Sequence, residues 1–215
     1  MREKYLFDYL VSTTEAEHVT STPVILAQAK GKDTTLAALA QTVVNCQLCQ
    51  LRQAAKQVIF GSGNPQAKLL LVGEGPGAEE DEQGQPFVGA AGKLLTKILA
   101  SVDISREEVY ITNVVKCRPP GNRAPTTGEI ETCLPHLLAQ IELLNPKIVL
   151  CLGAVAAKAL IDPQARVSVV RGKWVERHGR HWMATFHPAA LLRDQTKKRP
   201  VWHDIQKVRD IYRSL

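Results

Sequence analysis

The chain has 215 residues, of which 45% are hydrophobic and 22% are charged, as is typical of a soluble globular protein with its own core. No apolar run approaches the roughly eighteen residues of a membrane-spanning helix, and the N-terminal segment has no signal-peptide pattern, so we expect a cytoplasmic protein that does not associate with membranes. The net charge of +6 favours a polyanionic partner such as nucleic acid, although many proteins this basic bind none.

Residues 1–33 are rich in threonine, serine and charged side chains, and we expect them to form a loosely ordered N-terminal extension. Residues 34–215 are predicted to form one domain in which helices and strands alternate. Helices are predicted at residues 34–44, 89–99, 127–144, 154–160 and 201–214, and strands at residues 68–73, 109–115, 148–153, 167–170, 174–177 and 182–185. This alternation is typical of an α/β layer fold with a central, largely parallel sheet.

Three sequence motifs lie at the ends of predicted strands. The loop GEGPG at residues 73–77 follows the first strand, Asn113 lies near the end of the second, and HPAALL at residues 187–192 follows the last. In open α/β sheets the ligand binds outside the carboxyl ends of the strands. We therefore expect these three motifs to converge on one crevice.

Four of the five cysteines lie beside predicted turns or helix starts. Cys46 and Cys49 form a C-x2-C pair, and Cys117 and Cys133 follow in KCRPPGNR and ETCLPHL. Two thiolates on one turn and two more from elsewhere in the chain can complete a four-thiolate site. The spacing does not separate zinc from an iron–sulfur cluster, and four unrelated buried thiols are a third interpretation. Cys151, inside the apolar run IVLCLG, is interpreted as a buried structural thiol.

The glycine-rich loop and the acidic residues behind it form a second candidate site. Gly75 and Gly77 allow their backbone amides to approach a ligand closely, but the loop matches neither the phosphate-binding GxxxxGK[ST] pattern nor the dinucleotide-binding GxGxxG pattern. Carboxylates lie at residue 74 and at residues 79–82. Most of them fit a solvated acidic loop. One or two are expected to perform acid–base chemistry, because carboxylates are unusual in a crevice built for a polyanion.

Phe87 and the segment HPAALLR complete the candidate site. A phenylalanine in a loop between a proline and a glycine is either a core residue or a stacking platform for a flat ligand. His187, at a strand end, is either structural or positioned in the crevice to stabilise an anion. Leu191 and Leu192 are expected to be exposed beside Arg193, where a leucine could wedge into a stack of bases.

Together these segments resemble the uracil-DNA glycosylase superfamily, and in particular its family 4, the iron–sulfur-containing type of bacteria and archaea. The resemblance rests on the ordered segments GEGPGAEEDEQGQPFVGAAGKLL, TNVVKCRPPGNRAPTTGEIETCLPHL, IVLCLGAVAAKAL and HPAALLR, and on the cysteine spacing; it covers roughly residues 40–213. It implies an α/β three-layer sandwich with a central four-stranded, mainly parallel sheet flanked by helices. It also implies a [4Fe–4S] cluster bound by Cys46, Cys49, Cys117 and Cys133.

The resemblance further implies an activity and a role for each site residue. A member of this family flips uracil out of single- or double-stranded DNA and hydrolyses its N-glycosidic bond without cutting the strand, as a step of base-excision repair. Phe87 would stack on the extruded uracil, Asn113 would read its edge, and His187 would donate a hydrogen bond to its O2 atom. Leu191 would fill the gap left in the DNA, with Arg193 beside it.

Several questions stay open from the sequence. The better-known branch of the superfamily has an aspartate where this chain has Gly75, so the catalytic carboxylate is assigned to Glu74 or Glu80, with Asp81 behind them. The same fold could instead remove other deaminated or mismatched bases, or bind DNA without catalysis. We expect a monomer, and the sequence identifies no replication or repair partner.

Overall fold

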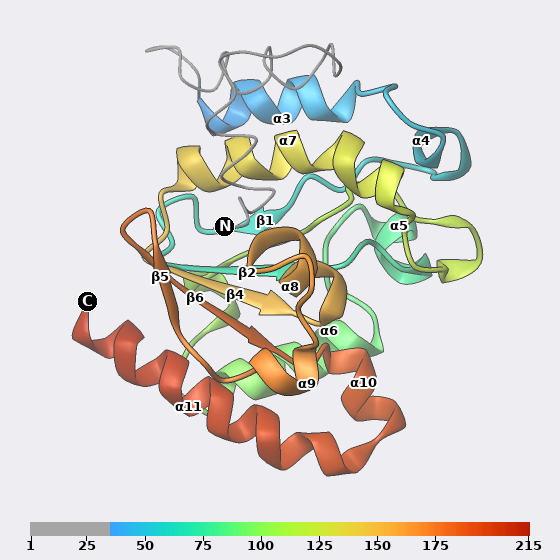
Figure 1. The fold of residues 1–215 in the computed structure, drawn as a ribbon. Coiled ribbons are helices and arrows are strands. Elements are labelled where there is room, and N and C mark those ends of the chain that lie inside the picture. The colour runs from blue at the N-terminus through green and yellow to red at the C-terminus, as the bar shows by residue number, and fades with distance from the viewer. Residues whose placement is uncertain (1–34) are drawn as a thin grey trace.

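The computed structural model describes residues 35–215, so the predicted extension at residues 1–33 lies outside the described residues. Residues 35–215 form a six-stranded sheet with helices on both faces (Figure 1). The strand order is β1-β3-β2-β4-β6-β5. The strands are β1 (Ser62–Gly63), β2 (Leu69–Gly73), β3 (Tyr110–Asn113), β4 (Ile148–Leu152), β5 (Val175–Arg177) and β6 (Arg180–Thr185).

The four central strands are parallel, as predicted. β2 lies between β3 and β4, and β6 pairs with the other side of β4, all in parallel register. The short strands β1 and β5 extend the two edges in antiparallel orientation. The predicted four-stranded parallel sheet is therefore confirmed at the centre, and the observed sheet is wider by one antiparallel strand at each edge.

Helices connect the strands and form the outer layers. The longer helices are α3 (Leu36–Val44), α6 (Ala90–Ala100), α7 (Thr127–Leu144) and α11 (Lys198–Ser214), and the shorter ones are α4 (Leu51–Ala54), α5 (Ala78–Gln83), α8 (Ala154–Leu160), α9 (Val167–Val170) and α10 (Pro188–Arg193). Single 3-10 turns lie at Arg106–Glu108, Pro120–Asn122 and Gln195–Lys197. No helix within residues 35–215 is long and apolar enough to cross a membrane.

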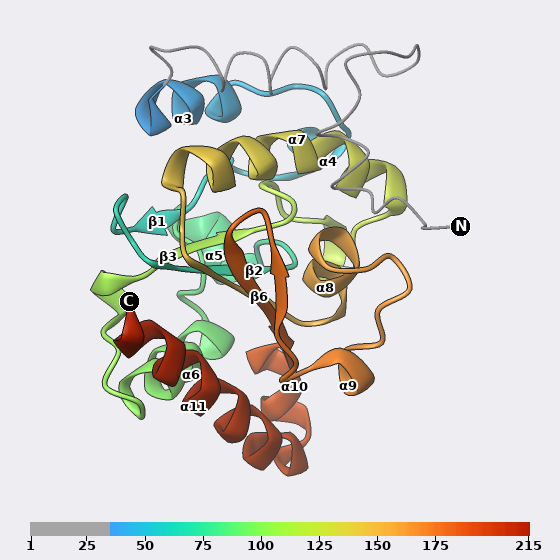
Figure 2. The ribbon, with the colours of Figure 1, turned by 60° about the vertical axis from the view of Figure 1, so that its left-hand side comes forward.

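Two hydrophobic cores lie on the two faces of the sheet. Along β2, Leu70 and Val72 belong to the core beneath α7 and α8, whereas Leu69 and Leu71 belong to the core beneath α6 and α11. Successive side chains of a strand point to opposite faces, so a strand covered on both faces is apolar throughout. Helix α3 forms a further layer on the outer side of α7, and α6, α10 and α11 gather on the opposite side of the sheet (Figures 1 and 2).

One of the predicted elements is wrong. Residues Val167–Val170, predicted as a strand, form the short helix α9. Both sides of β6 are already paired, with β4 and β5, so this β-branched segment has no open position beside that strand. Helix α7, predicted at the same residues, is capped by Thr126: the Thr126 hydroxyl accepts from the Glu129 N–H at 3.3 Å, and the Glu129 carboxylate accepts from the Thr126 N–H at 2.7 Å.

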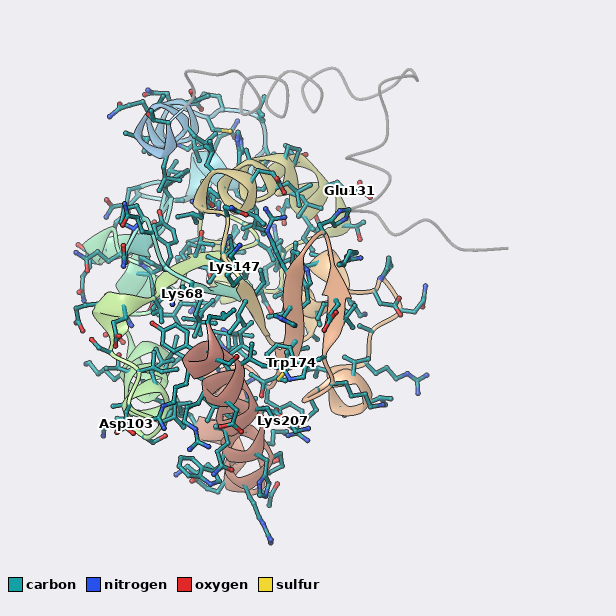
Figure 3. The ribbon with its side chains drawn as sticks, turned by 90° about the vertical axis from the view of Figure 1, so that its left-hand side faces the viewer. Lys68, Asp103, Glu131, Lys147, Trp174 and Lys207 are labelled. Atoms are coloured by element: carbon teal, nitrogen blue, oxygen red, sulfur yellow. The ribbon has the colours of Figure 1, made fainter. Side chains whose placement is uncertain are left out.

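The carboxyl ends of the parallel strands lie side by side at one end of the sheet, perpendicular to the edges formed by β1 and β5. Gly73 of β2 is directly opposite Asn113 of β3, and β4 and β6 end in register with each other. The loops that leave these strands therefore start side by side, as predicted. The opposite end of the sheet is marked by Lys68 and Lys147, which precede β2 and β4 (Figure 3). There the Lys147 N–H donates to the Lys68 carbonyl at 2.9 Å.

A buried carboxylate ties α11 to the end of β6. Asp204, on α11, is 2% exposed and accepts from the Thr185 hydroxyl at 2.6 Å and from Nε of Arg171 at 2.9 Å. Thr185 is the last residue of β6 and lies two residues before His187. This network fixes the strand end from which His187 enters the candidate site.

Candidate active site

Gly73 leaves the space in which Asn113 and Phe87 meet. A β-carbon placed on Gly73 would lie 2.3 Å from Oδ1 of Asn113 and 2.5 Å from Cζ of Phe87. Both distances are far below van der Waals contact, so any side chain at this position would displace the two groups. The glycine that opens the GEGPG loop is therefore required for their close approach.

The Asn113 side chain is buried and offers an unused acceptor. It is 1% exposed, and its Oδ1 atom has no hydrogen-bond partner among residues 35–215. A buried polar atom without a partner costs about 1–3 kcal/mol, and native proteins keep few of them. An amide oxygen in this situation is suited to a ligand that brings its own N–H donor.

Phe87 is held in a strained backbone conformation. Its φ is +55°, which bulky residues rarely adopt. The Glu80 carboxylate fixes the turn that follows, because its Oε1 accepts from the N–H groups of Val88 and Gly89, both at 2.9 Å. On the other side, Nη2 of Arg106 donates to the carbonyl of the preceding residue at 2.7 Å. These contacts hold the aromatic ring at the strand ends.

His187 follows β6 and caps helix α10. Its Nδ1 accepts from the Ala189 N–H at 3.2 Å, so the proton of the neutral ring is on Nε2. Burial, supported by the positive charge of Arg193, lowers the pKa of His187 to about 4. The ring is therefore neutral above that pH, with one N–H to donate. Its centroid lies 5.5 Å from that of Phe87, with the ring planes 32° apart.

The three candidate carboxylates differ in the hydrogen bonds that they accept. Glu80 uses both oxygens on backbone N–H groups, since Oε2 accepts from Gly77 at 3.1 Å in addition to the contacts of Oε1. Asp81 is 2% exposed and accepts from the Lys56 N–H at 3.0 Å. Within residues 35–215 no donor hydrogen-bonds the Glu74 carboxylate, whose pKa is raised by partial burial and lowered by Arg193. Glu74 is the carboxylate that remains available.

Two glycines of the GEGPG loop make contacts that stabilise the loop. A β-carbon on Gly75 would lie 2.7 Å from Cγ2 of Val115, so the loop packs against the segment after β3 only because this residue is a glycine. The sequence predicted that the amides of Gly75 and Gly77 approach a ligand. The Gly77 amide is engaged by Glu80 inside the loop, and the prediction stays open for Gly75.

The prediction that Leu191 is exposed is wrong. Leu191 is 1% exposed, whereas Leu192 is 46% exposed. Adjacent residues of a helix point about 100° apart, and α10 packs on α6, so only one of the two leucines is accessible. The sequence did not separate them, because α10 was not predicted as a helix. Arg193 follows, and its positive charge acts to lower the pKa of both Glu74 and His187.

The four predicted thiol ligands converge. One pocket between α4, α7 and the segment after β3 is lined by Cys46, Cys49, Cys117 and Cys133. Burial raises the pKa of Cys117 to about 12 and that of Cys133 to about 11, so thiolates at these positions need a positive centre to stabilise them. As they stand in residues 35–215, no three His, Cys, Asp or Glu side chains are arranged to hold a metal ion. Cys151 is fully buried in β4, as predicted for a structural thiol.

A buried lysine that the sequence analysis missed joins the cysteine pocket to Asn113. Lys116 is 1% exposed, and its Nζ donates to the Asn113 carbonyl at 2.9 Å, to Oγ1 of Thr112 at 2.7 Å and to Oε1 of Gln140. Its backbone N–H donates to Sγ of Cys133 at 3.3 Å. The available signal was a lysine directly after an apolar strand end, in VVKC, since a lysine is buried only with partners.

Comparison with known proteins agrees with this geometry. A family model described as the uracil DNA glycosylase superfamily matches residues 60–206. A type-4 uracil-DNA glycosylase from Thermotoga maritima is 44% identical over 175 residues, which are 80% of this chain and 91% of the relative. A type-4 enzyme from Archaeoglobus fulgidus is 41% identical over 181 residues, again 80% and 91% of the two chains. One from Pyrobaculum aerophilum is 44% identical over 165 residues, 72% and 83% of the two chains.

Proposed function

The chain belongs to the uracil-DNA glycosylase superfamily and to its type-4 family, and from this premise we propose that it is a base-excision repair enzyme that removes uracil from DNA. It hydrolyses the N-glycosidic bond and leaves an abasic site. The observation that carries the proposal is the meeting of Asn113, Phe87 and His187 at the carboxyl ends of the strands. An unused acceptor, a flat apolar ring and a neutral N–H donor are the groups that an extruded pyrimidine needs.

Asn113 accounts for the selection of uracil. Uracil presents an N–H donor at N3 beside an acceptor at O4, and an amide offers the complementary acceptor and donor. Oδ1 of Asn113, which is buried and without a partner, accepts from N3–H. Cytosine has a lone pair at N3, which would face that oxygen and leave both acceptors unpaired. Phe87 stacks on the base, an interaction that contributes about 1–3 kcal/mol in comparable sites.

His187 and Glu74 act on the two charges that form when the bond breaks. The leaving uracil becomes an anion, and the Nε2–H of His187 donates to its O2 atom as the negative charge develops. The sugar becomes oxocarbenium-like, and the available carboxylate of Glu74 stabilises the positive charge or orients the attacking water. The product is an intact strand with an abasic site, because the reaction needs no lysine nucleophile.

The direct test is incubation with a uracil-containing oligonucleotide. We expect release of free uracil and a strand that breaks only after alkali treatment, with no release from matched oligonucleotides that contain cytosine, thymine or hypoxanthine. Binding without release would support a non-catalytic DNA-binding protein. Release of thymine or hypoxanthine at a comparable rate would support the broader substrate range, and strand cleavage without alkali would contradict simple hydrolysis.

Replacing Asn113 by alanine should abolish discrimination between uracil and cytosine. The variant loses the acceptor for N3–H, and one uncompensated hydrogen bond of about 1–3 kcal/mol corresponds to roughly a 5- to 150-fold lower kcat/KM on uracil. The measurement is kcat/KM on uracil and cytosine duplexes. Asn64→Ala, at an exposed asparagine in the loop before β2, is the matched control. Unchanged selectivity in Asn113→Ala would overturn the assignment of the base-reading residue.

Glu74 and Glu80 should respond differently to replacement by glutamine. Glu74→Gln removes the available charge and is expected to lower kcat by about 10²-fold or more with little change in thermal stability. Glu80→Gln replaces one of the two acceptor oxygens with an NH₂ donor, so it breaks at least one of three hydrogen bonds to backbone N–H groups and should lower the free energy of unfolding by about 1–3 kcal/mol. Rates at saturating substrate and urea melts separate the two effects. The opposite pattern would make Glu80 the catalytic carboxylate.

Leu192, rather than Leu191, is proposed to occupy the gap left by the extruded nucleotide. Leu192→Ala should weaken uracil excision from duplex DNA more than from single strands, because only the duplex has a gap to fill. Leu191→Ala should instead lower stability by about 2–5 kcal/mol, as expected for a buried leucine. The readouts are single-turnover rates on both DNA forms and a thermal melt. Equal losses on both forms in Leu192→Ala would remove it from this role.

A [4Fe–4S] cluster is the group that we propose for the cysteine pocket. Four thiols from three segments line it, and burial raises the pKa of Cys117 to about 12 and that of Cys133 to about 11, so their ionisation requires a positive centre. Cys46, Cys49, Cys117 and Cys133 would supply the four thiolate ligands of such a cluster. The bound cluster would stabilise the fold by joining the segment before α4 to α7 and to the segment after β3.

A further inference from the structure

Two buried nitrogen groups line the cysteine pocket without a hydrogen-bond partner. His136 lies three residues after Cys133 on α7, so the two side chains share a face of the helix. It is 2% exposed, and both of its ring nitrogens are without a partner in residues 35–215. Nε of Arg52, after the C-x2-C pair, is also buried and without a partner, while its Nη1 donates to the Ala55 carbonyl at 3.2 Å. Both side chains line the same pocket as the cysteines.

The neighbouring protein groups do not satisfy these nitrogens. Lys116, the charged group that acts on His136, is a donor rather than an acceptor. Its three N–H bonds are directed at Thr112, Asn113 and Gln140. A buried N–H without an acceptor is costly, so such groups in native proteins have partners. The sulfur atoms of four cysteines line the same pocket and can accept hydrogen bonds.

We propose that His136 and Arg52 donate N–H···S hydrogen bonds to the cluster held by the four cysteines, and that these bonds raise its reduction potential. The inference rests on the cluster assigned to this pocket in the proposed function. Donation to sulfur of an anionic cluster is charge-assisted, and burial strengthens it. Such bonds stabilise the more negative, reduced cluster more than the oxidised one. Because the donors come from α4 and α7, they act on two sides of the pocket.

The test compares the reduction potential of the iron-loaded wild-type protein with that of four variants. His136→Phe keeps a ring but removes both nitrogens, and the ratio of reduced to oxidised cluster at a fixed potential should fall about tenfold, which is about 59 mV for one electron. His136→Gln restores a donor and should recover part of the shift. Arg52→Met should lower the potential independently. His203→Phe, on the exposed side of α11, should leave it unchanged.

Iron content, Fe–S vibrational spectra in D₂O and uracil release are measured on the same samples. The Fe–S stretching frequencies of the wild-type protein should shift on deuteration, and those of His136→Phe should shift less. Full iron content with an unchanged potential in both His136→Phe and Arg52→Met would overturn the proposal. Loss of iron in His136→Phe and His136→Gln alike would also overturn it, because His136 would then be a ligand. If His136→Phe does not fold, Arg52→Met and His136→Gln decide the question.

The same measurements separate this inference from the proposed function. If the wild-type protein releases uracil but contains no iron, the proposed cluster and its hydrogen bonds are wrong and the proposed activity stands. If it has full iron and its variants show the expected potential shifts, but it releases no uracil, the proposed activity is wrong and the hydrogen bonds to the cluster stand.

Discussion

Replacing His187 by asparagine is expected to lower kcat for uracil release by roughly 10²–10³-fold while the protein stays folded. Asparagine is a favoured N-cap residue, so its side-chain oxygen can take over the hydrogen bond that Nδ1 accepts from the Ala189 N–H. The shorter side chain does not carry an N–H to the position of Nε2. KM should change little, because the charge on O2 develops only as the bond breaks.

The measurement for His187→Asn is single-turnover uracil release at pH 6 and pH 8. The pKa of His187 is about 4, so the wild-type ring is neutral at both values and the deficit should be the same. His203→Asn, at an exposed histidine of α11, is the matched control and should keep its activity. A His187→Asn variant as active as this control would exclude His187 from the chemistry.

The same variant should alter the pH dependence of stability. Because the folded-state pKa of His187 lies below its ordinary value of about 6.5, the unfolded chain binds more protons between these two pH values. This contribution to stability is present above about pH 6.5 and is lost as the pH falls toward 4. His187→Asn should therefore lose less stability than the wild-type protein over this range in urea melts.

The sheet and the position of the site were predictable because they depend on local pattern. The runs at Leu69–Gly73 and Ile148–Leu152 are apolar at every position, and this is a property of strands covered on both faces. Once those strands are parallel, the motifs that follow them must start at one edge. The convergence of Asn113 and His187 near Phe87 follows from topology, without knowledge of any contact.

The sequence did not predict which side chains are free to contact a ligand. This depends on hydrogen-bond and packing partners that residue type and spacing do not identify. Glu74 and Glu80 are both carboxylates of the segment that follows β2. They differ because Glu80 accepts hydrogen bonds from three backbone N–H groups. Leu191 and Leu192 differ only in which one α10 turns toward α6. Neither difference has a signature in residue type or spacing.

Buried polar residues behind the site were missed for a related reason. Lys116 contributes to the net charge of +6 that favours nucleic acid, but it does not lie on the surface. It is instead buried, with its ammonium group directed at three oxygens. Arg123 makes two hydrogen bonds to Glu129 at the start of α7. Basic composition predicted a partner class correctly without identifying which side chains face it.

Replacing Cys117 by alanine is expected to remove the brown colour of the proposed iron–sulfur cluster and to lower the free energy of unfolding by more than about 4 kcal/mol. Loss of a structural metal group is among the few single changes with so large an effect, because the binding free energy is part of the folding free energy. Cys151→Ala is the matched control. Cys151 is also buried but lies in β4, outside the pocket.

The control isolates the cluster from the packing of a buried sulfur atom. Deleting one buried atom leaves a small cavity, so Cys151→Ala should cost about 1 kcal/mol and keep its iron. Iron and sulfide content, visible absorption and urea melts of the two variants give the comparison. If Cys117→Ala kept its iron and had the same free energy of unfolding as Cys151→Ala, Cys117 would not be a ligand. A colourless wild-type protein that contains zinc would contradict the cluster assignment and support a single zinc ion in this pocket.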